Sequence, residues 1–97
     1  MKTQEEYIRL LSEYFHTTAI RYGIVKMAIF GSVSRNEQNK DSDIDIAYEG
    51  EPDIFLRIRM KNELEQLFKC KVDIIRLSKQ VTHSLFGENI SKDLLYV

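Results

Sequence analysis

The stretch GSVSRNEQNKDSDIDI, from Gly31 to Ile46, places a glycine-serine step shortly before a cluster of aspartates. It follows an apolar, β-rich run from Ile24 to Phe30, which predicts a buried strand that breaks into a tight turn. A polar segment from Val33 to Ser42 predicts a short helical turn and then a loop. The alternation from Asp43 to Tyr48 predicts a second strand. On this strand Ile44, Ile46 and Tyr48 would share one face, and Asp43, Asp45 and Ala47 the other.

Two long helices flank these strands. Thr3 and Glu6 form a capping-box signature, and apolar residues at helical spacing then predict a helix that Gly23 ends as a left-handed C-cap. A second helix is predicted from Asp53 to Lys69, with an acidic residue at its N-terminus. Its apolar set is Ile54, Phe55, Leu56, Ile58, Met60, Leu64, Leu67 and Phe68, and the basic run Arg57, Arg59 and Lys61 is predicted to form its solvated face.

The C-terminal third completes the predicted fold. A third strand is predicted from Lys71 to Leu77, with Val72 and Ile74 on one face and Asp73 and Ile75 on the other. Ser78 is predicted to cap a third helix, whose apolar residues are Leu85, Phe86 and Ile90. The segment from Leu94 to Val97 is either a last helical turn or an edge strand. The whole chain, 1–97, therefore reads as a single α+β domain with helices packed on a small mixed β-sheet.

Composition narrows the classes of function. The 14 basic and 15 acidic residues leave a net charge of −1, which gives no strong signal for nucleic-acid binding. The lone Cys70 excludes an internal disulfide and a multi-cysteine metal site, and it favours a reducing, cytoplasmic location. No apolar run resembles a signal peptide or a membrane span, so no membrane association is expected. A chain of 97 residues is also too short to enclose a deep pocket by itself.

The aspartates form the first candidate site. Asp43 and Asp45 would leave the same strand face about 7 Å apart, because side chains alternate along a strand. Unpaired charges at the edge of an apolar core are costly, and a hard divalent cation such as Mg²⁺ would relieve that cost. Asp73 is the candidate third ligand. The alternatives are a solvated turn or helix cap for the first two and an edge position for Asp73. An EF-hand fails, because Ile46 and Pro52 stand where it requires Gly and Glu.

The second candidate feature is the step Gly31-Ser32. Glycine allows a sharp turn, after which backbone N–H groups can face an anion, and the serine adds a hydroxyl donor. The sequence is neither a Walker A loop nor a dinucleotide-binding fingerprint, because the other glycines of those motifs are missing. An anion-binding turn just ahead of a metal-binding strand suits a complex of a phosphate with a metal ion.

Together these residues resemble the minimal nucleotidyltransferase group of the DNA polymerase beta superfamily. The resemblance rests on Gly31-Ser32, Arg35, the run from Ser42 to Ile46, and the later run from Val72 to Ile74. It implies the palm-like fold of that superfamily. Asn36 stands where the family usually has glycine, and asparagine tolerates a left-handed backbone better than most residues.

The resemblance implies transfer of a nucleoside monophosphate, AMP from ATP, to a hydroxyl group. Gly31 and Ser32 would hold the β- and γ-phosphates, and Arg35 and Ser42 would also contact the nucleotide. For Arg35, an ion pair with Asp41 or a neighbouring acid that holds the loop is an equal alternative.

The same resemblance assigns the metal ligands. Asp43 and Asp45 would bind two Mg²⁺ ions, and Asp73 would bind one of them while helping to deprotonate the acceptor hydroxyl. Two such ions clamp the attacking and leaving oxygens of an in-line displacement.

The acceptor follows from the small size of the chain, which leaves no substrate-binding domain. Minimal members of the group resemble antitoxins that place AMP on a tyrosine of a HEPN-domain ribonuclease toxin. The resemblance thus implies such a partner, in a homo- or hetero-oligomer. The alternatives are a non-catalytic antitoxin that only masks its partner, and a small-molecule nucleotidyltransferase. The latter needs an acidic sugar-binding wall, which the sequence does not show.

Overall fold

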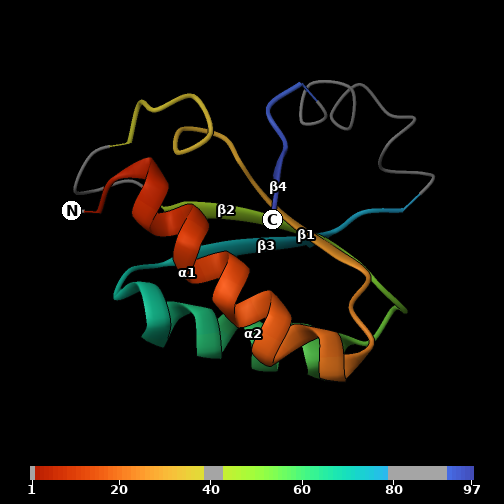
Figure 1. Ribbon diagram of the computed structural model, residues 1–97. Helices are drawn as coiled ribbons and strands as arrows, with labels where there is room; N and C mark the ends of the chain where they lie inside the picture. Colours follow the sequence, from red (N-terminus) through yellow and green to blue (C-terminus); the bar gives the residue numbers. More distant parts are fainter. Residues whose placement is uncertain (1, 39–42, 79–91) are drawn as a thin grey trace.

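The computed structural model describes residues 2–38, 43–78 and 92–97, and in it both long helices cover one face of a four-stranded sheet (Figure 1). The predicted third helix falls almost entirely on 79–91 and so lies outside the described residues, as does Ser42. The elements are α1 (Gln4–Thr17), the 3-10 helix η1 (Ala19–Tyr22), β1 (Lys26–Phe30), β2 (Ile44–Glu49), α2 (Ile54–Phe68), β3 (Val72–Arg76) and β4 (Leu95–Tyr96).

The sheet is mixed, as predicted, with the strand order β3-β2-β1-β4. β1 runs antiparallel to both β2 and β4, whereas β2 and β3 are parallel. A parallel pair needs a crossover connection, and α2 supplies it. The C-terminal segment takes the strand form of its two predicted alternatives. This topology brings the end of β1 and the beginnings of β2 and β3 to one end of the sheet.

Capping residues fix where the helices begin and end. The predicted capping box is present, since the Thr3 hydroxyl accepts from the Glu6 N–H at 3.2 Å and a Glu6 carboxylate oxygen accepts from the Thr3 N–H at 3.3 Å. Asp53 caps α2 through the N–H of Leu56 at 3.1 Å. Lys69 ends α2 in the left-handed region, with φ of 60°. The predicted bounds of the second helix are therefore confirmed.

The prediction that the first helix continues to Gly23 is wrong. The α-helix ends at Thr17, and the 3-10 helix Ala19–Tyr22 replaces the last turn. The Thr17 hydroxyl donates to the Glu13 carbonyl at 2.6 Å, and Thr18 leaves the helical region at φ −126°. Two adjacent β-branched residues disfavour helix continuation. Gly23, at φ 85°, caps the 3-10 helix instead.

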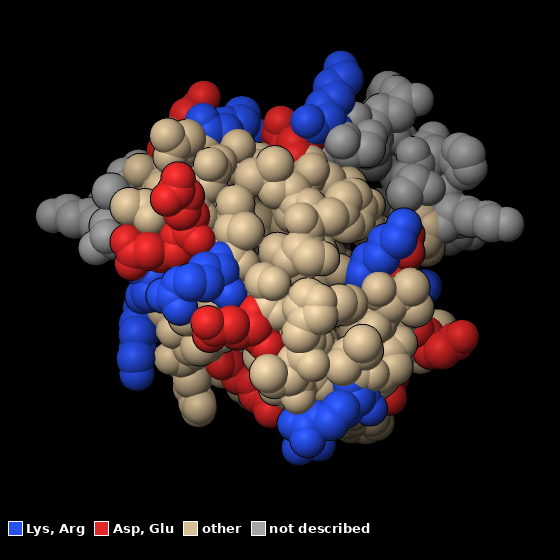
Figure 2. Space-filling view, in the orientation of Figure 1, with Lys and Arg blue, Asp and Glu red and all other residues tan. Residues whose placement is uncertain are grey.

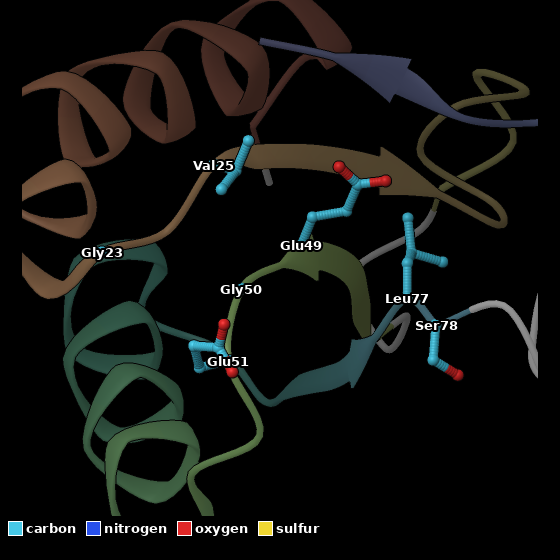
Figure 3. A pocket seen from close by; sticks show the side chains of 7 residues that line it. All are labelled: Gly23, Val25, Glu49, Gly50, Glu51, Leu77 and Ser78. Carbon is cyan, nitrogen blue, oxygen red and sulfur yellow. The ribbon is translucent and has the colours of Figure 1, made fainter.

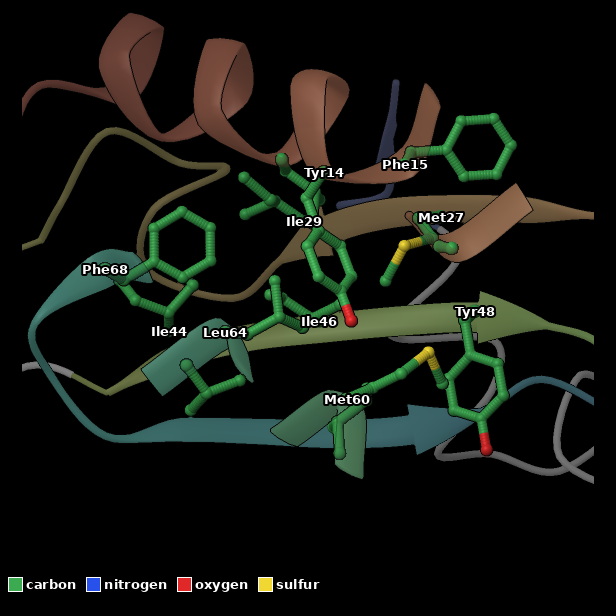
Figure 4. Close-up of a cluster of buried hydrophobic side chains, with 14 of the residues drawn as sticks. Tyr14, Phe15, Met27, Ile29, Ile44, Ile46, Tyr48, Met60, Leu64 and Phe68 are labelled. Atoms are coloured by element: carbon green, nitrogen blue, oxygen red, sulfur yellow. The ribbon is translucent and has the colours of Figure 1, made fainter. Parts of the chain in front are cut away.

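The core lies between the helices and the covered face of the sheet (Figure 4). The alternation predicted for the second and third strands is confirmed, because alternate apolar residues of these strands belong to the buried cluster, as they do in β1. These strand residues are Met27, Ile29, Ile44, Ile46, Tyr48, Val72 and Ile74. The hydroxyls of Tyr14 and Tyr22 donate to the Glu63 carboxylate at 2.8 and 3.1 Å, which ties the N-terminal helices to α2.

Part of the apolar set predicted for the second helix does not enter the core. Ile54, Phe55 and Ile58 are 65%, 82% and 52% exposed. The buried stripe of α2 is instead Met60, Leu64 and Phe68, at four-residue spacing, and Leu56 of the first turn packs against the same core.

The surface carries charges of both signs. Figure 2 shows acidic and basic side chains interspersed around a mostly uncharged centre, with no patch of one sign on this face. Within the described ranges, no helix is long and apolar enough to cross a membrane.

Candidate active site

Two of the predicted site carboxylates are cross-strand neighbours. Asp45 pairs directly with Asp73 in the parallel register of β2 and β3, and adjacent strands lie about 4.8 Å apart. Both side chains leave the sheet on the face opposite the helices, because Ile44 and Ile46 point into the core. Asp43 stands two residues before Asp45, just ahead of β2, and is exposed. The sequence prediction of a shared face is confirmed for Asp45 and Asp73.

The environment of Asp45 disfavours its charged form. Partial burial raises the pKa of this carboxyl above its usual range, and the charges of Asp73 and Asp43 raise the pKa further, against a smaller lowering by Arg35. Asp45 therefore experiences the negative charge of both other aspartates. A cation placed among them would remove the repulsion.

Gly31 ends β1 directly beside this carboxylate. Its φ is 73°, in the left-handed region that glycine adopts without strain. A Cβ atom at this position would collide with the Asp45 carboxylate and lie 3.1 Å from its Cγ. Phe30, the residue before it, pairs with Asp45 in the register of β1 and β2. The absent side chain therefore leaves room for Asp45 beneath the turn.

Hydrogen bonds within the chain hold the turn after Gly31. The Gly31 carbonyl accepts from the Ser34 hydroxyl at 2.8 Å, and the Ser32 carbonyl accepts from the Glu37 N–H at 2.8 Å. Asn36 adopts φ 57°, so this residue does occupy the left-handed conformation at the position where the family usually has glycine. The tight turn predicted after the first strand is confirmed.

Sequence reasoning missed a residue that fixes this turn. The side-chain amide of Gln4, in the first turn of α1, donates to the carbonyls of Val33 and Ser34 at 2.9 Å each. The turn is thereby tied to a helix that begins 29 residues earlier than Val33. A lone glutamine near a helix N-terminus carries no sequence signal for such a contact.

Arg35 forms an ion pair across the fold. Its guanidinium lies 2.6 Å from a carboxylate oxygen of Asp93, just before β4, and 3.2 Å from Glu37. These acids raise the pKa of Arg35 further. Of the two alternatives for Arg35, the structure contains the loop-holding ion pair. Asp41, the partner considered first, lies outside the described residues.

The donor chemistry of the site fits a divalent cation, although its ligands are not gathered into a finished metal site. Asp43, Asp45 and Asp73 offer the carboxylate oxygens that hard cations prefer. In the part of the chain that the structure describes, no three His, Cys, Asp or Glu side chains are close enough to hold a metal ion as they stand. Metal binding would require these three side chains to move closer together.

A groove of about 550 Å³ opens beside the carboxylates. Asp45, Asp73 and Phe30 line it from the sheet, together with Ile74 and Ile75 of β3. Arg57, Ile58 and Lys61 line it from α2. The sequence predicted only a solvated face for this basic run and gave no indication that two of its members line the same groove as the carboxylates.

A second pocket, of about 400 Å³, lies at the opposite end of β2 and β3 (Figure 3). It is lined by Gly23, Val25, Glu49, Gly50, Glu51, Leu77 and Ser78. It contains none of the clustered aspartates. The groove beside Asp45 and Asp73 is therefore the better candidate for the chemistry.

Comparisons with known proteins show the family to which the chain belongs. Residues 11–96 match the family described as "Polymerase beta, Nucleotidyltransferase". A Methanocaldococcus jannaschii protein named "Putative protein adenylyltransferase" is 37% identical over the full length of both chains. The protein adenylyltransferase MntA of Thermococcus cleftensis is 29% identical over all of this chain and 98% of its own.

Solved structures show the same fold. One described as a minimal nucleotidyltransferase superposes with a TM-score of 0.74 at 27% identity, covering 97% of this chain and 95% of its own. A second, described as a toxin-antitoxin with AMP-PNP, gives a TM-score of 0.66 at 19% identity, covering 98% and 72% of the two chains. The latter likeness supports the fold alone.

Proposed function

Because the chain belongs to the polymerase beta nucleotidyltransferase family, in its minimal MntA-like group, we propose that it transfers AMP from ATP to a tyrosine hydroxyl of a partner protein. The partner in this proposal is a HEPN-domain ribonuclease toxin, and AMP on its tyrosine blocks it. The observation that carries the proposal is the in-register pair Asp45 and Asp73, with Gly31 packed against Asp45.

The turn at the end of β1 holds the triphosphate in this proposal. Gly31 and Ser32 present backbone N–H groups and a hydroxyl to the β- and γ-phosphates. Arg35 adds a positive charge near them once it leaves Asp93. Ser42 is assigned to the same nucleotide from its motif position, although it lies outside the described residues.

The carboxylates carry the metal-dependent part of the proposal. Asp43, Asp45 and Asp73 would hold two Mg²⁺ ions, which would supply charge neutralisation to the transfer. Asp73 accepts the acceptor's proton as its oxygen forms a bond to the α-phosphorus. The bond from that phosphorus to the bridging oxygen breaks, and pyrophosphate leaves.

The relatives support this reading through their own names. Two are called protein adenylyltransferases, and two solved structures are described as toxin-antitoxin complexes, one of them with AMP-PNP. We place the reaction in the cytoplasm, because Cys70 is a free thiol. The whole chain acts in this scheme as one catalytic domain within a hetero-oligomer.

Labelling tests the proposal directly. Purified protein is incubated with ATP labelled at the α-phosphate, Mg²⁺ and the protein encoded by the neighbouring gene. We expect label on a tyrosine of that partner, located by mass spectrometry, and none with Asp45→Asn. Equal labelling by the wild type and this variant, or no label with either, would refute the proposed reaction.

A second candidate is a non-catalytic antitoxin that only masks its partner. It is favoured by the lack, among the described residues, of a ready group of three metal ligands. Calorimetric titration with Mg-ATP separates the candidates, since the enzyme should bind the nucleotide and Asp45→Asn should weaken that binding.

A further inference from the structure

The groove beside the carboxylates indicates how the acceptor is bound. We propose that α2 and the outer edge of β3 bind an extended, acidic segment of the partner protein, which carries the acceptor hydroxyl to Asp73. This inference rests on the proposed function and adds to it the recognition surface and the chemistry of the segment recognised.

β3 presents an open edge within the described sheet, because it stands last in the order β3-β2-β1-β4. The Lys71 carbonyl and the Leu77 N–H bond to residues of β2, so the odd-numbered residues of β3 direct their backbone groups toward β2. Even-numbered residues direct theirs outward. The Val72 N–H donates to a Glu65 carboxylate oxygen at 3.1 Å. Ile74, the next residue whose backbone groups point outward, lines the groove.

A peptide strand added at this edge would be placed correctly for transfer. Edge strands accept an extra strand through main-chain hydrogen bonds, and side chains on neighbouring strands share a face at each register position. The residue opposite Asp73 would therefore point to the face that carries Asp73 and Asp45. A hydroxyl at that position would lie beside Asp73, with Asp45 on the next strand of the same face.

The charges on α2 indicate which side chains the bound partner segment carries. Arg57 and Lys61 lie one helical turn apart, line the groove, and form no ion pair with any described residue. Arg59 differs, because it lies 3.8 Å from Glu63 and 5.2 Å from the centre of the Tyr22 ring. Asp45 and Asp73 line the same groove, and with their charges assigned to the bound metal ions, the two cations favour acidic side chains on the bound segment.

Apolar surface continues this site along α2. Ile58 lies between the two cations in sequence, and it lines the groove although it is 52% exposed. Ile54 and Phe55, one turn earlier, are 65% and 82% exposed. Exposed large side chains of this kind are frequent anchors in protein–protein interfaces. The segment recognised is thus both acidic and apolar.

The sheet order argues against ATP as the ligand of these cations. The proposed phosphate-binding turn follows β1, and β2 separates β1 from β3. Arg57 and Lys61 line the groove from α2, together with Asp73, Ile74 and Ile75 of β3, whereas Gly31 lies against Asp45 at the end of β1. The two substrates would then approach the carboxylates from opposite sides, as in-line transfer requires.

Peptide binding tests this inference separately from catalysis. The probes are a fluorescein-labelled peptide, Glu-Val-Glu-Val-Tyr-Val-Glu, and its counterpart with Lys at each Glu. Anisotropy is measured with Mg²⁺ and a non-hydrolysable ATP analogue present. We expect the acidic peptide to bind about tenfold more tightly. The variant Arg57→Glu/Lys61→Glu should reverse that preference. Equal binding of both peptides, or an unchanged preference in this variant, would overturn the proposal.

Two controls make the result specific. Arg9→Glu/Arg21→Glu changes the net charge by the same amount at exposed positions on α1 and η1, and should keep the wild-type preference. An acidic peptide with alternate N-methylated amides cannot pair along the edge, and should bind at least about tenfold more weakly. Undiminished binding of this peptide would overturn the edge-strand mode. Peptide binding does not require AMP transfer. A failure of the labelling experiment would therefore refute the proposed reaction but leave the result of the peptide-binding experiment unchanged.

Discussion

Gly31 lies so close to the Asp45 carboxylate that no side chain fits between them. A Cβ atom on Gly31 would lie 3.1 Å from the Asp45 Cγ and would collide with its carboxylate oxygen. The end of β1 and the carboxylate of β2 therefore share one van der Waals contact. In the proposed enzyme, this contact sets how closely the phosphates approach the metal ligands.

Gly31→Ala should reduce AMP transfer by about 100-fold, because the methyl group must displace the Asp45 carboxylate. Initial rates of label incorporation measure this effect. Gly23→Ala is the matched control, since Gly23 also has a positive φ, of 85°, but a Cβ atom added there would meet nothing within 4 Å. Both variants should lose roughly 1–2 kcal/mol of stability from backbone strain. A similar loss of activity in both would show that strain, rather than the contact with Asp45, is responsible.

Asp45→Asn should stabilise the metal-free protein while abolishing transfer. Burial and neighbouring carboxylates raise the pKa of Asp45, so its ionised form destabilises the folded state as the pH rises past the unfolded-state value. At neutral pH, after solvent screening, removing this charge should contribute on the order of 0.5 kcal/mol, or roughly 2–4 °C in melting temperature. The difference from wild type should vanish well below a pH of about 4, where the Asp45 carboxyl is protonated in both the folded and the unfolded state.

The measurement is a series of thermal melts in chelator across that pH range. Mg²⁺ with a non-hydrolysable ATP analogue should raise the melting temperature of the wild type more than that of Asp45→Asn. A variant less stable than wild type at neutral pH would contradict the destabilising role given to this carboxylate.

Gln4→Glu should raise the KM for ATP by about tenfold, because a carboxylate cannot donate to the two turn carbonyls and repels them. An acidic residue in the first turn of a helix is otherwise favourable, so the melting temperature of this variant should equal that of the wild type. Steady-state kinetics measure KM and kcat separately. Gln66→Glu, an exposed change of the same kind on α2, is the control. A change in kcat alone would mean that Gln4 does not act through the nucleotide-binding turn.

Asp93→Asn and Arg35→Ala should change ATP affinity in opposite directions. Asp93 holds the Arg35 guanidinium at 2.6 Å, so its neutralisation should free Arg35 for phosphate and tighten ATP binding about threefold. Arg35→Ala should weaken it. Titration calorimetry with Mg-ATP gives both values. Weaker binding in both variants would assign Arg35 to holding the loop instead.

The sequence predicted those parts of the fold that depend on local pattern. Alternation along each strand placed Asp45 and Asp73 opposite the core residues of their own strands, and the predicted bounds of α2 were confirmed. The predicted end of the first helix was wrong. Two adjacent threonines disfavour the continuation of the helix, although the apolar stripe continues past them. The exposure of Ile54, Phe55 and Ile58 was missed, since their pattern alone cannot show which part of an apolar stripe meets the sheet.

Contacts between distant segments were harder to predict. The bonds from Gln4 to the turn, and the pair of Arg35 with Asp93, join residues far apart in sequence that carry no spacing signal. That Arg57 and Lys61 line the same groove as the carboxylates also depends on how α2 packs beside β3. Each of these contacts could be recognised only from the arrangement of the helices and strands in space.

The parallel pairing of β2 with β3 has a consequence for how the protein is made. A nascent chain that has emerged only as far as Pro52 contains Gly31 and Asp45 but not Asp73, and the helix between the strands must dock before they can pair. Catalytic competence should thus appear all at once during refolding, at the same moment as native helical circular dichroism. A ribosome-bound fragment ending ahead of β3 should be inert toward ATP.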